Sequence, residues 1–259
     1  MFKLYGKYAA ARLKSMMEYK ASFLMTTLTQ FLLAFTTLLS INFLMRRFGA
    51  VGGFTYEEVL ICYAASNFSF AFAECFFRGF DTFSSLIGNG GFDRIMVRPR
   101  NEIFQIVASQ IEFSKLGRMF TALAILVYAL GVSGISWNVG RVLVLAFMLA
   151  GGVAFFTGLF IIYASICFFT LEGLEFMNIF TDGGRELGKY PLSIYGKGIL
   201  TFFTCVLPFA CAQYYPFLFL CGKSDSLLCA LSPAACFVFL LPCYAFWRFG
   251  LRHYKSTGS

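Results

Sequence analysis

Six long apolar runs dominate this sequence and limit what it can fold into. A helix that crosses a membrane needs roughly 20 mostly apolar residues. Six segments come close to this length or exceed it: 22–45, 58–80, 117–136, 142–169, 198–220 and 227–249. They predict an all-α, polytopic membrane protein with six transmembrane helices.

The composition excludes a soluble protein. The chain is 59% apolar and only 13% charged, whereas a soluble domain is about 25% charged. Its 35 phenylalanines could not be hidden from water in a domain of this size. No linker divides the sequence, so residues 1–259 are expected to form a single membrane domain. The net charge of +8 does not indicate nucleic-acid binding, because the basic residues flank the apolar runs.

The first 21 residues predict an amphipathic helix that lies in the membrane interface. Lys3, Lys7 and Lys14 fall on one helical face, roughly opposite Tyr5 and Leu13. A signal peptide fits less well, because the charges continue to Lys20 and the apolar run that follows is too long.

Prolines set the last two runs apart from the others. Four of them, Pro208, Pro216, Pro233 and Pro242, lie in these runs and are expected to kink or break the helices. The stretch 213–226 is then expected to form a re-entrant element between the last two spans.

Basic residues predict the orientation. With six spans and a cytoplasmic N-terminus, 17 Lys and Arg residues lie on the cytoplasmic side and 4 on the other. The positive-inside rule therefore predicts that both termini are cytoplasmic. The two long connections, 81–116 and about 170–197, are then cytoplasmic as well. The second, which contains Glu172, Glu175 and the pair Gly183–Gly184, is expected to form an amphipathic interfacial helix.

The sequence contains no recognisable catalytic, cofactor-binding or metal-binding site. The single histidine, His253, lies in the basic tail, and no phosphate loop of the GxxxxGK[ST] type is present. Most of the nine cysteines lie inside apolar runs and are expected to pack as small apolar residues. A disulfide between Cys221 and Cys229 is the alternative for that pair, if their loop faces an oxidising space.

Glu74 and Arg78 are the ionisable pair of the second run, four residues apart on one helix face. An ion pair that orients the helix at the cytoplasmic interface is one interpretation. Gating of a substrate is the other, because ionisable groups within a membrane are often functional.

The segment 81–100, called the elbow below, combines turn-forming glycines with apolar and ionic residues. Gly88, Gly90 and Gly91 permit a sharp turn, and Phe92 follows between charged residues. This pattern predicts a compact element that docks into a groove on another protein. The alternative is a solvated loop that only returns the chain to the membrane.

Four motifs resemble a known family. They are GGFDRIMVRPR in the elbow, FTDGGRELGKYPLSIYGK before the fifth run, LPFACAQYYP within it, and the ending FWRFGLRHYKSTGS. They are similar to type-two ABC-transporter permeases, in the branch described as an uncharacterised ABC permease, and the resemblance covers essentially the whole chain.

The resemblance implies a fold and partners. Such permeases have six spans, a cytoplasmic N-terminal helix and short re-entrant helices between the fifth and sixth spans. Two permeases pair, as a homodimer or heterodimer, and each rests on a separate ATPase subunit that binds ATP and Mg. The coupling segment would be 81–116, and the ATPase-coupling residues matched to the motif are Gly91, Phe92, Asp93, Arg94, Arg98 and Pro99.

The expected protein is therefore the membrane subunit of an ATP-driven exporter in the cell membrane, and not itself an enzyme. The spans are rich in Phe and lack charges deep in the membrane, which favours an apolar or amphipathic substrate. A stand-alone secondary transporter or channel is the alternative, although no internal repeat of the kind common in such transporters is evident. A membrane-embedded enzyme is a further alternative, with no His/Asp/Glu cluster in any span to support it.

Overall fold

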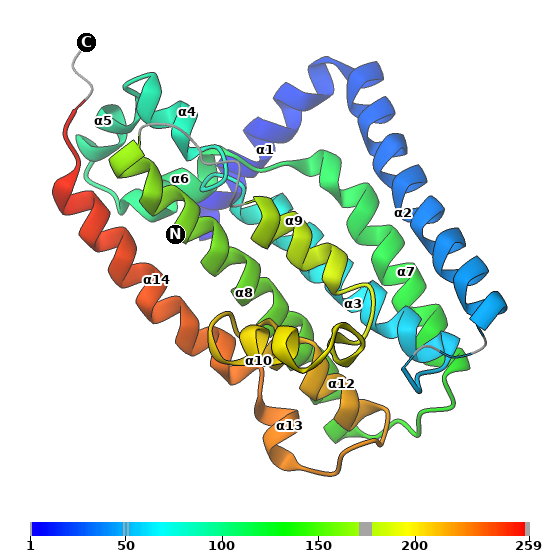
Figure 1. Ribbon diagram of the computed structural model, residues 1–259. Helices are drawn as coiled ribbons and strands as arrows, with labels where there is room; N and C mark the ends of the chain where they lie inside the picture. The colour runs from blue at the N-terminus through cyan, green and yellow to red at the C-terminus, as the bar shows by residue number, and fades with distance from the viewer. Residues whose placement is uncertain (1, 49, 51, 171–177, 257–259) are drawn as a thin grey trace.

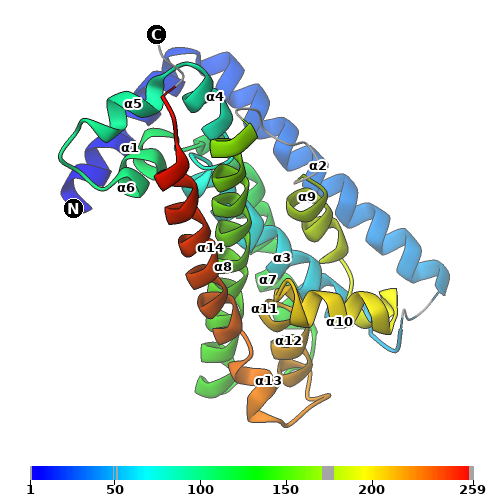
Figure 2. The same cartoon turned by 60° about the vertical axis from the view of Figure 1, so that its left-hand side comes forward.

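The computed structural model describes residues 2–48, 50, 52–170 and 178–256, and the regular structure within these ranges is entirely helical. Figures 1 and 2 show long helices running side by side, with short helices gathered at both ends. The expected all-α membrane protein is confirmed at this level.

Five helical stretches of the described chain are long and apolar enough to cross a membrane. They comprise α2 (Lys20–Phe48), α3 (Tyr56–Phe77), η1 (Phe113–Lys115) with α7 (Leu116–Val132), α8 (Val139–Thr170), and α13 (Leu227–Leu231) with α14 (Ala234–His253). These correspond to five of the six predicted runs.

The remaining predicted run, 198–220, is not a straight helix. It forms α10 (Lys197–Cys205), then α11 (Phe209–Ala212) and α12 (Tyr214–Leu220), and the two parts are bent by 85°. The break falls at Pro208, whose ring cannot continue a helix and whose nitrogen has no hydrogen to donate. Pro242, by contrast, lies inside the unbroken α14, so only some of the prolines have the expected effect.

Helix α3 lies at the centre of the spans. In its most apolar stretch, 83% of the residues are buried inside the protein, against 17% in α2 at the edge. It packs between α7 and α8, while α2 covers α7 and α14 covers α8. The outer helices therefore leave most of their apolar side chains for lipid.

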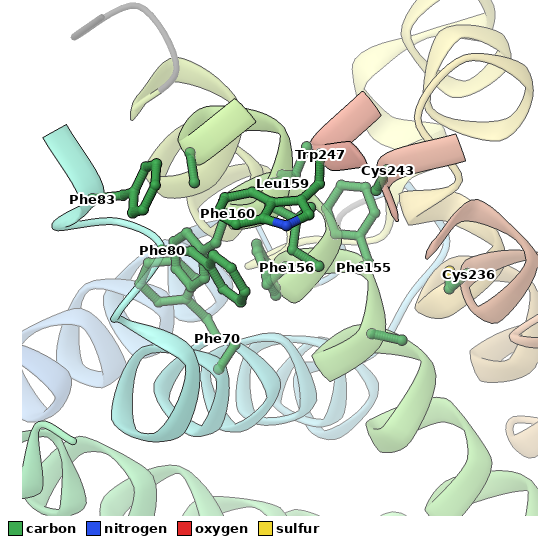
Figure 3. Close-up of a cluster of buried hydrophobic side chains, with 14 of the residues drawn as sticks. Phe70, Phe80, Phe83, Phe155, Phe156, Leu159, Phe160, Cys236, Cys243 and Trp247 are labelled. Carbon is green, nitrogen blue, oxygen red and sulfur yellow. The ribbon is translucent and has the colours of Figure 1, made fainter. Parts of the chain in front are cut away.

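Aromatic side chains fill the core between α3, α8 and α14. Phe70, Phe155, Phe156 and Trp247 are at most 2% exposed (Figure 3), and the ring centroids of Phe70 and Phe156 lie 5.0 Å apart. Aromatic rings in such edge-to-face pairs add stabilisation beyond the burial of their surface. The many phenylalanines of the sequence therefore act partly as core residues and partly as lipid-facing ones.

Eight of the nine cysteines lie within the predicted runs, and most of them are buried, as the sequence predicts. Cys236 and Cys243 of α14 are 0% and 1% exposed within the aromatic core (Figure 3). Cys221 and Cys229 are both free thiols and partly buried, so the alternative of a disulfide between them is not realised.

One end of the molecule gathers the N-terminal helix, the elbow and the C-terminus, as Figure 2 shows. Here α1 (Phe2–Glu18) packs against α6 (Glu102–Ser109). Tyr5 and Phe104 lie 6.4 Å apart between ring centroids, and Arg12 donates a 3.1 Å hydrogen bond to Gln110. The predicted N-terminal helix is therefore present, and one side of it contacts the protein.

The segment around α9 (Asn178–Leu187) does not lie outside the spans as expected. The Arg185 guanidinium stacks 5.3 Å from the ring centre of Phe70, and Gln213 donates hydrogen bonds to the carbonyls of Gly188 and Cys62. Residues 185–188 therefore lie beside the middle of α3 rather than beyond the end of the spans. Glu172 and Glu175 fall outside the described residues.

The chain then continues to the far end. A Cβ added at Gly52, in the turn between α2 and α3, would lie 2.8 Å from the Ile194 side chain, which belongs to η3 (Leu192–Tyr195). Since this turn is at the end opposite the elbow, residues 178–194 cover much of the thickness of the spans. Gln213 satisfies the Gly188 carbonyl here. Arg185 pairs with Asp182 and Glu186 of its own helix, so the polar groups of this segment are largely compensated.

Candidate functional site

The elbow consists of two short helices joined by a tight turn. Helix α4 (Phe83–Gly88) ends at Asn89, and α5 (Gly91–Met96) begins after Gly90. Gly90 has φ of +62°, a left-handed conformation in which a side chain would be strained. The expected sharp turn is therefore present, and it reverses the chain within a few residues.

Phe92 anchors the elbow to the spans. Its side chain is 0% exposed, and its ring centroid lies 5.1–5.5 Å from those of Phe83, Phe168 and Tyr254. Helices of this chain bury the ring, so Phe92 is not exposed for docking on another protein. Its burial instead fixes the elbow on the ends of α8 and α14.

Asp93 is also engaged within the chain. Its carboxylate accepts hydrogen bonds from the Tyr254 hydroxyl at 3.0 Å and the Ser256 hydroxyl at 2.6 Å. Hydrogen bonds to a charged acceptor are short and comparatively strong. Asp93 therefore ties the elbow to the segment that follows α14.

Gln105 of α6 fixes the last part of the elbow, residues 95–100. Its buried amide donates to the Ile95 carbonyl at 3.1 Å and to the Arg100 carbonyl at 3.0 Å. The stretch between these two carbonyls is thereby fixed at both ends, although most of its side chains reach solvent.

The exposed tip of the elbow is basic with an apolar centre. Val97 is 85% exposed and Met96 47% exposed, while Arg94, Arg98 and Arg100 are exposed around them. Of the matched residues, Arg94, Arg98 and Pro99 thus lie at the surface, and Gly91, Phe92 and Asp93 position the tip from beneath. We call Arg94, Met96, Val97, Arg98 and Arg100 the elbow tip.

Glu74 and Arg78 belong to a larger group of charges than the sequence indicated. The Glu74 carboxylate contacts Arg78 at 2.9 Å, Lys115 at 2.8 Å and Arg118 at 2.6 Å. Arg118 also donates to the Gln30 amide oxygen at 3.1 Å, which joins α2 to the group. These four charged residues, the ion cluster, connect α3 to the beginning of α7.

The centre of the ion cluster is buried, with Glu74 and Arg118 only 7% and 8% exposed, whereas Arg78 is half-buried. One carboxylate faces three cations, so the excess positive charge is balanced only in part, by Asp81 at 3.8 Å from Arg78. Burial raises the pKa of the Asp81 carboxyl, and Arg78 opposes that rise. The interpretation of Glu74 and Arg78 as an isolated ion pair that orients the helix is therefore incomplete.

Sequence reasoning missed Lys115, Arg118 and Gln30 because they lie some 40 residues from Glu74 along the chain. The available signal was a polar glutamine inside the first apolar run and two basic residues at the start of the third. Within the described parts of the chain, no group of three His, Cys, Asp or Glu side chains is placed to hold a metal ion.

The helices and the buried charges define a multi-pass membrane protein with an ordered, basic projection at one end. The family model described as ABC-2 family transporter protein matches residues 31–258. The chain belongs to this family of ABC transporter permeases, and the resemblance noted in the sequence is confirmed. No curated protein and no solved structure gave a significant match.

Proposed function

We propose that the chain is the membrane-spanning permease of an ATP-driven exporter, which receives its energy from a separate ATPase subunit. Members of the ABC-2 family are membrane subunits rather than catalysts, which supports the assignment of ATP hydrolysis to a separate subunit. The elbow tip is the surface that would receive the motion of the ATPase.

The position of the elbow tip is the observation that carries the proposal. The exposed apolar side chains of Met96 and Val97 lie in a stretch that also exposes three arginines. Apolar contacts at the centre of an interface tend to supply affinity, whereas charges around it supply specificity. Because Phe92 and Asp93 fasten the same element to α8, α14 and the C-terminal segment, a push on the tip would be transmitted to the spans.

The double variant R94E/R98E tests the proposal. The chain is purified from membranes with its partners, and MgATP hydrolysis of the copurified material is measured together with transport into vesicles. Both are expected to fall strongly, while the amount of chain in the membrane stays normal because the residues are exposed.

The matched control is Arg46→Glu. Arg46 is an exposed arginine near the C-terminal end of α2, at the end of the molecule opposite the elbow. This variant should leave hydrolysis and transport unchanged. Transport by the purified chain at a normal rate without nucleotide would favour the stand-alone transporter instead.

We further propose that α9 and the segment up to Ile194 provide the fifth crossing. The bent pair of α10 with α11 and α12 would then be the re-entrant element at the outer end. The contacts of Arg185 with Phe70 and of Ile194 with Gly52 support this path. With this path, Arg185, Lys189 and Lys197 no longer count among the cytoplasmic basic residues. The remaining asymmetry of basic residues still favours a cytoplasmic location for the elbow and both termini.

Pairing with a second permease is supported by the outer face of α9. The Glu186 side chain is 50% exposed although its neighbours contact the middle of α3. A carboxylate at this depth would be costly against lipid. A second permease subunit, with water between the two, would cover it.

A further inference from the structure

A polar cavity lies between α2, α3, α7 and α9. Its volume is about 170 Å³, which is room for several water molecules or a small charged group. Arg118, Arg185 and Lys189 line it together with Glu186, and Tyr63 and Asn67 form its wall on α3. None of these residues belongs to the elbow.

The cavity lies deep within the spans. Tyr63 is seven residues after the start of α3 and Asn67 is ten residues before its end. At 1.5 Å per residue, the wall is thus roughly 10 Å from one end of the helix and roughly 15 Å from the other. Charged side chains at such a depth are costly and generally mark the path of a polar or ionic ligand.

In α9 and the residues just after it, the cationic side chains are more buried than the carboxylates. The side chains of Arg185 and Lys189 are 20% and 19% exposed, whereas those of Asp182 and Glu186 are 57% and 50% exposed. Arg185 contacts Glu186 at 3.0 Å and Asp182 at 3.4 Å, and Lys189 also pairs with Glu186. The cavity lining, with Arg118, Arg185 and Lys189 against the single carboxylate of Glu186, therefore carries an excess of positive charge.

Arg185 retains a free donor. Within the described residues its buried Nε has no hydrogen-bond partner, although the guanidinium is held by Phe70 on one face. Arg118 differs, because Glu74 and Gln30 already bind its nitrogens. An additional negatively charged acceptor would satisfy Arg185, and a guanidinium suits the planar oxygens of carboxylates and phosphates.

We propose that this cavity binds the anionic group, phosphate or carboxylate, of a ligand that enters between α2 and α9. Leu33 of α2 lines the cavity and is 56% exposed. An amphiphile would place its charged group against Arg185 and Lys189 and its chain along the apolar surface of α2. That this ligand is the exported substrate rests on the proposed function, but its binding does not.

Binding to the purified full-length chain in a neutral maltoside detergent tests the proposal. The probes are dodecyl phosphate, inorganic phosphate and dodecyltrimethylammonium, each titrated by calorimetry. Dodecyl phosphate is expected to bind saturably and the ammonium amphiphile not to bind. Tighter binding of dodecyl phosphate than of inorganic phosphate would identify an amphiphile as the ligand, and equal binding would identify a free anion.

Variants of the lining residues complete the test. Arg185→Gln and Lys189→Gln should each weaken dodecyl phosphate binding about tenfold or more, since each removes a charge-assisted hydrogen bond. Arg185→Lys should retain part of the affinity, and Glu186→Gln should increase it because a competing carboxylate is lost. Arg46→Gln, at an exposed site outside the cavity, is the control.

Three results would overturn the proposal: no saturable binding of either phosphate probe, unchanged affinity in the Arg185→Gln and Lys189→Gln variants, or equally tight binding of the ammonium amphiphile. Glu186→Gln keeps the test decisive if a cation variant does not fold, because its expected effect is a gain. R94E/R98E should leave probe binding intact, so a failure of the exporter hypothesis is distinguishable from a failure of this site.

Discussion

Phe92 and Val97 are five residues apart in the elbow, yet one is 0% exposed and the other 85% exposed. The difference follows from the two short helices: α5 presents Phe92 to Phe83, Phe168 and Trp247, and it ends before Val97. One residue therefore stabilises the elbow, and the other is available to a partner.

These two positions predict opposite effects of an alanine substitution. Phe92→Ala should lower the free energy of unfolding by roughly 3–5 kcal/mol, because it leaves a cavity in a packed aromatic cluster. Val97→Ala should leave stability within about 0.5 kcal/mol of the original but weaken the association with the ATPase. Thermal unfolding in detergent and copurification measure the two quantities. A Phe92→Ala variant of unchanged stability would contradict the burial described here.

The ion cluster makes a second prediction about a single residue. Glu74→Gln removes the carboxylate shared by Arg78, Lys115 and Arg118. Leaving such cations uncompensated should cost roughly 3–5 kcal/mol of stability. Thermal unfolding measures the loss, and Glu18→Gln, at an exposed position of α1, is the control. A lower transport rate at unchanged stability would instead support a role of Glu74 in gating.

Among the elements, α9 depends on the close approach of small residues. A Cβ at Gly188 would lie 2.1 Å from the Ser66 hydroxyl oxygen and 2.7 Å from the Gln213 side-chain oxygen. No side chain fits there without a shift of the backbone. The glycines of this segment allow a charged helix to pack against α3, where bulkier residues would hold it away.

Gly188→Ala is therefore expected to displace α9 and to destabilise the chain by roughly 1–3 kcal/mol, as overpacking commonly does. Gly198→Ala is the matched control, because a Cβ there would meet nothing within 4 Å. Thermal unfolding of both variants in detergent tests this. Equal stability of the two would show that α9 does not rest on Ser66.

The apolar runs were sufficient to predict five long spanning helices, because burial in lipid requires continuous apolar sequence over about 20 residues. The segment 178–196 could not be placed in the same way. Charged residues such as Asp182, Arg185 and Glu186 alternate with apolar ones in this segment. An interfacial helix and a helix packed among the spans would both show this pattern, so the sequence does not distinguish them. The contacts of Gly188 with Ser66 and Gln213 decide between the two, and they join residues far apart in sequence. The elbow turn was predictable from its glycines, whereas the burial of Phe92 depends on Phe168 and Trp247.

For the whole molecule, the proposed orientation predicts opposite labelling of the two ends. In a variant whose exposed Cys205 is replaced by Ser, Val97→Cys should react with a membrane-impermeant maleimide only after cells are broken. Val139→Cys, 78% exposed at the opposite end, should react in intact cells. The reason is the concentration of basic residues at the elbow end. The reverse pattern would invert the proposed topology.

The contacts of Phe92 and Asp93 also determine when the elbow can fold during synthesis of the chain. Their partners Trp247, Tyr254 and Ser256 are translated long after the elbow. At roughly 5–20 residues per second, the ribosome needs roughly 8–30 s to pass from position 92 to position 247. During that time the elbow lacks the ring and hydroxyl groups that hold it. A nascent or truncated chain would thus present an unformed elbow to the proposed ATPase partner.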